Sequence, residues 1–130
     1  MEWKKGTAIG DDVIEKVEAK YNIMLPSEYR NTVRMHNYAY PVPNIFDSEV
    51  SKEHVFNRLL SFDENDVENI FVFIPFLGES NSSLFPFGFD PFGNILCLEK
   101  EKVVLWMHDT DKVEFVANSF GEFLKGLYSI

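Results

Sequence analysis

What the chain lacks narrows its class before any motif is considered. A single cysteine, Cys97, rules out an internal disulfide framework and fits a reducing compartment. No segment approaches the run of about 18 consecutive apolar residues that a membrane-spanning helix needs. The first residues, 1–6, are not followed by an apolar stretch of signal-peptide length. We therefore expect a cytoplasmic protein that does not enter a membrane.

Basic residues are also few. The 130-residue chain has 12 Lys and Arg against 21 Asp and Glu, which gives a formal net charge of −9 and a pI near 4.7. No Lys or Arg lies between Arg58 and Lys100. Nucleic acids and anionic membranes both require basic surface, so we expect neither as a partner. A basic protein would be attracted by this field, although solubility alone also accounts for an acidic composition.

Recognisable catalytic and cofactor signatures are missing. The chain has no phosphate-cradling glycine loop, no Gly-x-Ser-x-Gly elbow and no dinucleotide fingerprint. Ser119 is explained by a helix-capping role, and Cys97 lies within an apolar strand pattern. The segment 108–111, His-Asp-Thr-Asp, could ligate a divalent ion, but it is what a polar turn after a strand looks like, and no second ligand cluster accompanies it. We expect no catalytic residues, no metal, no cofactor and no enzymatic activity.

The apolar content is sufficient for one core. Hydrophobic residues make up 45% of the chain and aromatic residues 15%, and 13 residues are phenylalanine. No repeat, linker or low-complexity tract divides the sequence, so residues 1–130 are expected to form a single domain.

Three helices are predicted from spacing and end signals. Apolar residues recur at helical spacing over 11–21, with acids at the start and Asn22 at the end. Pro26 is suited to the start of a second helix, which the prolines after residue 40 should terminate. The segment 119–122, Ser-Phe-Gly-Glu, is a capping box that predicts a C-terminal helix.

The block from residue 71 to residue 108 holds the densest apolar sequence, and we expect it to form the sheet against which these helices pack. Turn-forming clusters at 78–83 and 90–94 interrupt it. Residues 44–58 give mixed signals and are expected to be a loop, with at most a short strand or helical turn. The predicted strands are 71–76, 88–99 and 102–108, with further short strands at 59–62 and 114–117.

Several of these segments together resemble a known family. Leu-Pro-Ser-Glu-Tyr-Arg at 25–30 is one motif, and Ala-Asn-Ser-Phe-Gly-Glu-Phe-Leu at 117–124 is another. Between them lie Ile-Pro-Phe at 74–76, Gly-Asn-Ile-Leu-Cys-Leu at 93–98 and Val-Leu-Trp-Met-His-Asp at 104–109. In this order they resemble the SUKH superfamily, which includes fungal cell-wall-synthesis regulators and bacterial immunity proteins against polymorphic toxins. The resemblance covers about residues 11–128.

The resemblance implies an α+β fold, with a largely antiparallel β-sheet flanked by N-terminal helices and a C-terminal helix. It also implies a non-catalytic binding protein that neutralises a cognate toxin, often a nuclease, encoded by an adjacent gene. The alternative is a regulatory or scaffold module that binds an endogenous protein. One departure affects the loop after the second helix. Family members usually carry Asn-Gly there, whereas this chain has Asn37-Tyr38, and a non-glycine residue adopts a positive φ less readily.

Two features are candidates for contact with such a partner. The aromatic run 85–92 either closes the core at a sheet edge or presents an exposed aromatic anchor between acids. The clustered acids, which include Glu68 and Glu114, either form solvated faces or, if clusters converge, form an anionic patch. The candidate partner-binding residues are Asp47, Glu49, Asp63, Glu64, Asp66, Glu79, Phe85, Phe87, Phe89, Asp90, Phe92, Asp109 and Asp111.

Overall fold

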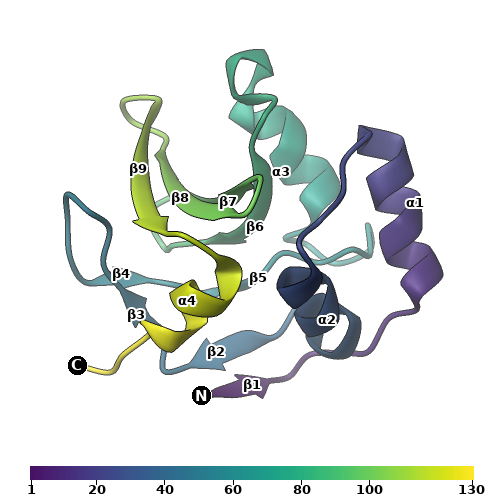
Figure 1. Ribbon diagram of the computed structural model, residues 1–130, viewed down its shortest axis with the longest axis horizontal. Helices are drawn as coiled ribbons and strands as arrows, with labels where there is room; N and C mark the ends of the chain where they lie inside the picture. Colours follow the sequence, from purple (N-terminus) through teal and green to yellow (C-terminus); the bar gives the residue numbers. More distant parts are fainter.

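A five-stranded antiparallel sheet lies between two layers of helices (Figure 1). The computed structural model describes residues 1–130. Two smaller sheets, each of two strands, accompany the five-stranded sheet. The α+β fold expected from the sequence is confirmed, and no helix is both long and apolar enough to span a membrane. The elements are β1 Glu2–Lys4, α1 Asp11–Tyr21, α2 Ser27–His36, β2 Tyr40–Val42, β3 Ile45–Phe46, β4 His54–Val55, β5 Arg58–Leu59, α3 Ile70–Leu77, the 3₁₀ turn η1 Glu79–Asn81, β6 Phe85–Phe89, β7 Ile95–Glu99, β8 Lys102–Met107, β9 Lys112–Ala117 and α4 Phe120–Lys125.

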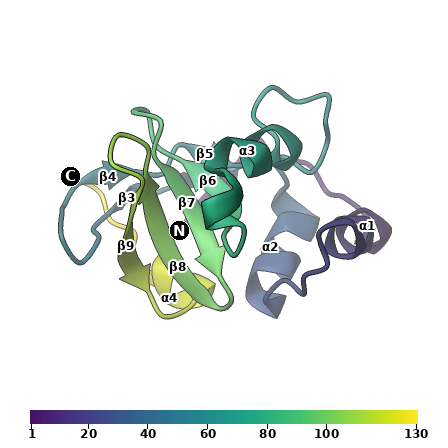
Figure 2. The same cartoon turned by 90° about the horizontal axis from the view of Figure 1, so that it is seen from above.

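The sheet has the order β5-β6-β7-β8-β9, and every pair of neighbours is antiparallel. One face packs against α2 and α4 in the main core, α1 packs on α2, and α3 covers part of the other face. Figure 2 shows α3 in front of the sheet and α4 behind it. Residues 44–58, expected to be mainly loop, contain the short hairpin β3–β4.

Three helices form where their end signals predict them. The helix α1 spans the predicted residues and ends at Asn22, whose φ of 53° is left-handed. Pro26 lies one residue before α2, and its fixed φ leads the chain into that helix. In α4, the Ser119 hydroxyl accepts a hydrogen bond from the Glu122 N–H at 3.1 Å, as a capping box requires.

The prediction of a strand at 71–76 was wrong, because this segment forms most of α3. Its residues are apolar on all sides, and such a run fits a buried strand or a buried helix equally well. The residues at its two ends favour the helix. The Asn69 side-chain oxygen accepts a hydrogen bond from the Val72 N–H at 3.0 Å, and Gly78 follows the last turn with a φ of 86°.

The aromatic run contributes to the main core rather than to the surface. Phe87 is fully buried and packs edge-to-face on Phe56 and Phe120, with ring centroids 5.9 and 5.3 Å apart. Phe85 is 7% exposed and packs against Tyr29. The hypothesis that these two phenylalanines form an exposed anchor was therefore wrong. The alternative, that they close the core, is correct, although their strand β6 is flanked by β5 and β7.

The loop after α2 keeps a positive φ without glycine. Tyr38 has a φ of 66°, a conformation that costs a non-glycine residue about 1–2 kcal/mol. Several contacts offset that cost. The Arg58 guanidinium stacks 3.4 Å from the centre of the Tyr38 ring, and its Nε and Nη2 donate to the Tyr38 carbonyl at 2.9 and 2.5 Å. The Tyr38 hydroxyl donates to Glu68 Oε1 at 2.5 Å.

Candidate partner-binding surface

Two of the acidic clusters meet along β9, the outer strand of the sheet. The loop between β3 and β4 runs beside this strand (Figure 1), and the β8–β9 turn lies at its end. We call the surface formed by these segments the acidic edge. Its carboxylates come from Asp47, Glu49, Glu53, Asp109, Asp111 and Glu114.

Glu49 fastens the loop to β9 through both its backbone and its side chain. Its N–H donates to the Phe115 carbonyl at 2.8 Å. The Phe115 N–H in turn donates to the Glu49 carboxylate at 3.1 Å. Both backbone groups of Phe115 therefore point away from β8 and toward the loop, and Glu49 satisfies them as a neighbouring strand would.

Glu114 makes the second attachment. Its Oε1 accepts hydrogen bonds from the hydroxyls of Ser48 at 2.5 Å and Ser51 at 2.9 Å, and Ser51 Oγ lies 2.7 Å from His54 Nε2. Because Ser51 has one hydroxyl proton and gives it to the carboxylate, His54 Nε2 must donate to Ser51. This order is the reverse of a nucleophilic site, where histidine accepts the serine proton. The cluster thus joins the loop to β9.

At the β8–β9 turn, Asp111 ties the sheet to the end of α3. Trp106 Nε1 donates to Asp111 Oδ1 at 2.6 Å, and Asn81 Nδ2 donates to the same oxygen at 2.9 Å. These bonds, the Trp106 bond first, lower the pKa of Asp111 below its ordinary value. Asn81 belongs to η1, which begins at the exposed Glu79, so this bond joins η1 to the β8–β9 turn.

Asp47 occupies the other end of the acidic edge. Its Oδ1 accepts hydrogen bonds from the Tyr128 hydroxyl at 2.6 Å and from the Glu53 N–H at 3.0 Å. The Tyr128 bond is the main reason that the pKa of Asp47 is lowered. Asp47 therefore connects the loop to the C-terminal segment.

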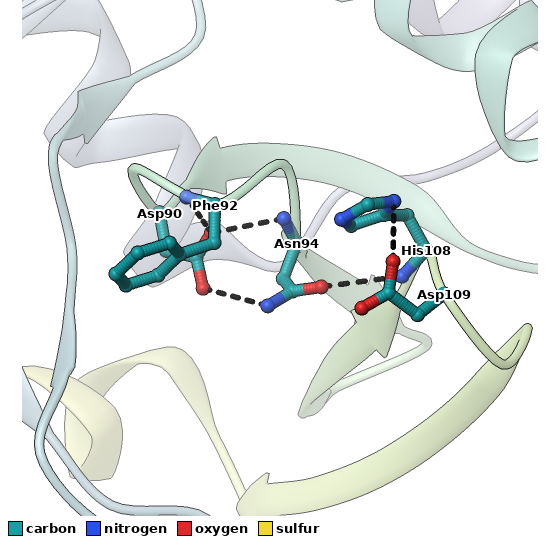
Figure 3. A network of polar contacts seen from close by, with 5 residues as sticks. All are labelled: Asp90, Phe92, Asn94, His108 and Asp109. Carbon is teal, nitrogen blue, oxygen red and sulfur yellow. Dashed lines mark hydrogen bonds and ion pairs between the residues drawn. The ribbon is translucent and has the colours of Figure 1, made fainter.

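Asp90 is not a surface acid, although the sequence suggested one. It is 3% exposed and accepts hydrogen bonds from the backbone N–H groups of Phe92 and Asn94 and from the Asn94 side chain, at 2.8 to 2.9 Å. Asn94 in turn accepts the His108 N–H at 3.2 Å, which joins the turns 90–94 and 108–111 (Figure 3). Asp90 fixes these turns, and Phe92 is left 76% exposed on the side opposite His108 (Figure 3).

The cluster Asp63, Glu64, Asp66 and Glu68 lies apart from the acidic edge, in the segment before α3. Asp63 caps Asn65, and Asp66 accepts the Ser61 hydroxyl at 2.6 Å, so both carboxylates also shape this segment. An open cavity of about 420 Å³ separates it from α1, whose Lys16 and Lys20 line the opposite wall. The side chains of this cluster bond to Ser61, Asn65 and Tyr38 and not to the loop 47–53 or β9, so we do not include it in the acidic edge.

The acidic edge also carries apolar groups that the sequence did not indicate. Val50 in the loop is 72% exposed and Val113 on β9 is 41% exposed. Phe89, a candidate from the aromatic run, lies elsewhere, on β6, where it is half-buried against Phe73. Isolated valines among charged residues are common, so only their position beside β9 makes them candidates.

The structure shows no metal site at the segment 108–111. His108 Nδ1 lies 3.3 Å from Asp109 Oδ1, but no group of three His, Cys, Asp or Glu side chains is arranged to hold a metal ion.

Comparison with known proteins gives one match. The model of the SMI1 / KNR4 family (SUKH-1) matches residues 8–126, which span the elements from α1 to α4 and include every residue of the acidic edge. No curated protein matches the chain. The match confirms the resemblance inferred from the motifs.

Proposed function

Because the chain belongs to the SMI1 / KNR4 family (SUKH-1), we propose that it is a non-catalytic binding protein that neutralises a cognate toxin. In this proposal it is an immunity protein, and the toxin is encoded by an adjacent gene. The toxin domain is basic, as a nuclease that binds phosphates is, and the acidic edge covers its active site. Carboxylates then occupy the positions that phosphate groups of the substrate would take.

The observation that carries the proposal is the convergence of separate acidic segments along β9. The loop 47–53 and β9 are more than 50 residues apart in sequence, yet Ser48 and Glu49 bond to Glu114 and Phe115 of β9, the strand into which the acidic β8–β9 turn leads. Convergence of like charges costs energy even where the carboxylates also hold the loop in place, and a basic partner would lower that cost.

The carboxylates of the acidic edge form no ion pair with lysine or arginine. The ion pairs of the structure join Glu2 to Lys4, Glu18 to Arg30, Asp11 to Arg34 and Asp109 to His108. No Lys or Arg therefore lies within 4.0 Å of an acidic-edge carboxylate. The exposed Lys52 and Lys112 belong to the same segments and reduce the field, but the six carboxylates outnumber them. A net negative field of this kind accelerates association with a basic protein and weakens over a Debye length of about 8 Å at physiological salt.

Co-expression with the protein encoded by the adjacent gene tests the proposal. The informative variant is Glu53→Lys with Asp109→Lys, because both residues are exposed and neither carboxylate holds a backbone group. The matched control, Glu15→Lys with Glu101→Lys, makes the same change of net charge on exposed sites elsewhere. We expect the acidic-edge variant to lower the association rate by about tenfold or more and to lose growth rescue.

The control variant should keep both the association rate and the rescue. Equal effects of the two variants would show that only net charge matters, and would exclude the acidic edge as the binding surface. A neighbouring protein that is not toxic, or whose toxicity this chain leaves unchanged, would exclude the immunity function. It would favour the regulatory or scaffold module instead.

A further inference from the structure

The outer side of β9 has backbone groups without partners. Phe115 turns its N–H and its carbonyl away from β8, toward Glu49. Alternate residues of a strand point their backbone groups to the same side, so the N–H and carbonyl of Val113 also point outward. Val113 lies opposite Trp106 of β8 in the register of the two strands. No residue of the loop 47–53 forms a hydrogen bond with the Val113 N–H or carbonyl.

This open position lies within the acidic edge. The loop 47–53 covers β9 at Phe115 and leaves the strand uncovered toward the β8–β9 turn. The Val113 side chain is 41% exposed, and Asp109 and Asp111 lie in the turn that leads into the strand. A backbone donor and acceptor, an apolar side chain and the Asp109 and Asp111 carboxylates are therefore close together along the chain, with Lys112 as the one basic residue among them.

We propose that an extended, basic segment of the partner protein adds to β9 at Val113 as a further strand of the sheet. The inference rests on the proposed function and specifies how the partner is held. A residue of that segment exchanges both backbone hydrogen bonds with Val113, and its lysine or arginine neighbours meet Asp109 and Asp111. Main-chain pairing provides affinity in this mode of recognition, and side chains provide selectivity.

The charge of the acidic edge identifies this occupant among the alternatives. A second copy of the chain paired through β9 would bring two sets of the same carboxylates together, with a net charge of −9 on each copy. None of the described residues 1–130 pairs with the outer side of β9 at Val113. A basic strand alone satisfies both the open backbone groups and the carboxylates.

Substitution of Val113 by proline tests the backbone contact directly. Proline removes an N–H that β8 does not use, so the β8–β9 ladder keeps its hydrogen bonds. Val113→Thr is the matched control, because it changes the side chain and keeps the N–H. In the complex with the protein encoded by the adjacent gene, we expect Val113→Pro to raise Kd by about tenfold or more and Val113→Thr by less than about threefold.

Amide hydrogen exchange of the unmodified complex gives a second readout that does not depend on how the proline variant folds. The Val113 amide should exchange rapidly in the free protein and be protected by about 100-fold or more in the complex. A complex in which this amide stays unprotected would overturn strand addition and leave the proposed function intact. Absence of any complex with that protein would overturn both.

Discussion

The two edge strands of the five-stranded sheet differ in how their outward backbone groups are hydrogen-bonded. At the β5 edge, the Leu59 N–H donates to the Ala39 carbonyl at 2.8 Å, and Arg58 is bound to the Tyr38 carbonyl. At the β9 edge, Glu49 covers Phe115 and the backbone groups of Val113 remain open. One edge is closed by the chain itself, and the other is bordered by carboxylates.

Burial accounts for the difference. Leu59 and Ala39 are fully buried, and a buried N–H without a partner would cost about 1–3 kcal/mol. The residues of β9 are half-buried or exposed, so water can satisfy backbone groups there. The β5 edge must be closed for the protein to fold, whereas the β9 edge is free to take a partner. Changes at the first should therefore affect stability, and changes at the second should affect binding.

The largest loss of stability should follow from opening the β5 edge at Asn37. This side chain is 1% exposed, and its oxygen accepts the Phe62 N–H at 2.9 Å while its amide donates to Ser61 Oγ at 3.1 Å. Asn37→Ala leaves the Phe62 N–H buried without a partner. We expect the free energy of unfolding to fall by about 2–3 kcal/mol, measured by urea denaturation.

The matched control is Asn65→Ala, because Asn65 is exposed and its side chain makes no hydrogen bond. It should change the unfolding free energy by less than about 0.5 kcal/mol. If Asn37→Ala and Asn65→Ala had the same free energy of unfolding, the hydrogen bonds of the buried Asn37 side chain would not stabilise the fold. That result would contradict the explanation that burial requires the β5 edge to be closed.

The parts of the fold that the sequence predicted are those with local signals. The helices α1 and α4 have apolar spacing and end residues that agree, so their limits could be inferred. The helix α3 lacks such agreement, because β-branched and aromatic residues fill a segment only eight residues long. Asn69 and Gly78 at its ends were the available signal, but Asn69 was interpreted as the end of an acidic connection and Gly78 as the start of a turn. The strand β1 was missed because its three residues pair only with β2.

The candidate surface was predictable only in part, because it depends on long-range contacts. Acidity is visible in the sequence, but only the fold shows that Glu49 and Glu114 meet while Asp63 lies elsewhere. Burial separates Phe87 from Phe92, although both occur in one aromatic run. Strand pairing determines which of them enters the core, and a run interrupted by glycine and proline gives no reliable alternation.

A smaller loss of stability should follow from detaching the loop at the β9 edge. Glu114→Ala removes the acceptor for the hydroxyls of Ser48 and Ser51 and keeps the backbone bond between Glu49 and Phe115. We expect unfolding to become easier by about 1 kcal/mol, since these bonds are partly exposed to water. Amide exchange at Val50 and Ser51 should accelerate. The control is Glu99→Ala, because Glu99 is exposed and its side chain makes no hydrogen bond. Similar amide exchange at Val50 and Ser51 in both variants would contradict the role of Glu114.

The smallest expected effect is a dependence of stability on acid pH from Asp111, which lies at the open edge and is exposed. Its pKa is lowered from 3.8 by the hydrogen bonds from Trp106 and Asn81. A group with a lowered folded-state pKa stabilises the protein above its unfolded pKa, and that contribution is lost as the pH falls through the folded value. The stability advantage of the native protein over Asp111→Asn should therefore be constant at neutral pH and decline below about pH 4. Unfolding followed by fluorescence, in a Trp3→Phe background that leaves Trp106 as the reporter, measures this difference. A difference that stayed constant down to pH values near 2 would show that Asp111 is not held ionised by these bonds.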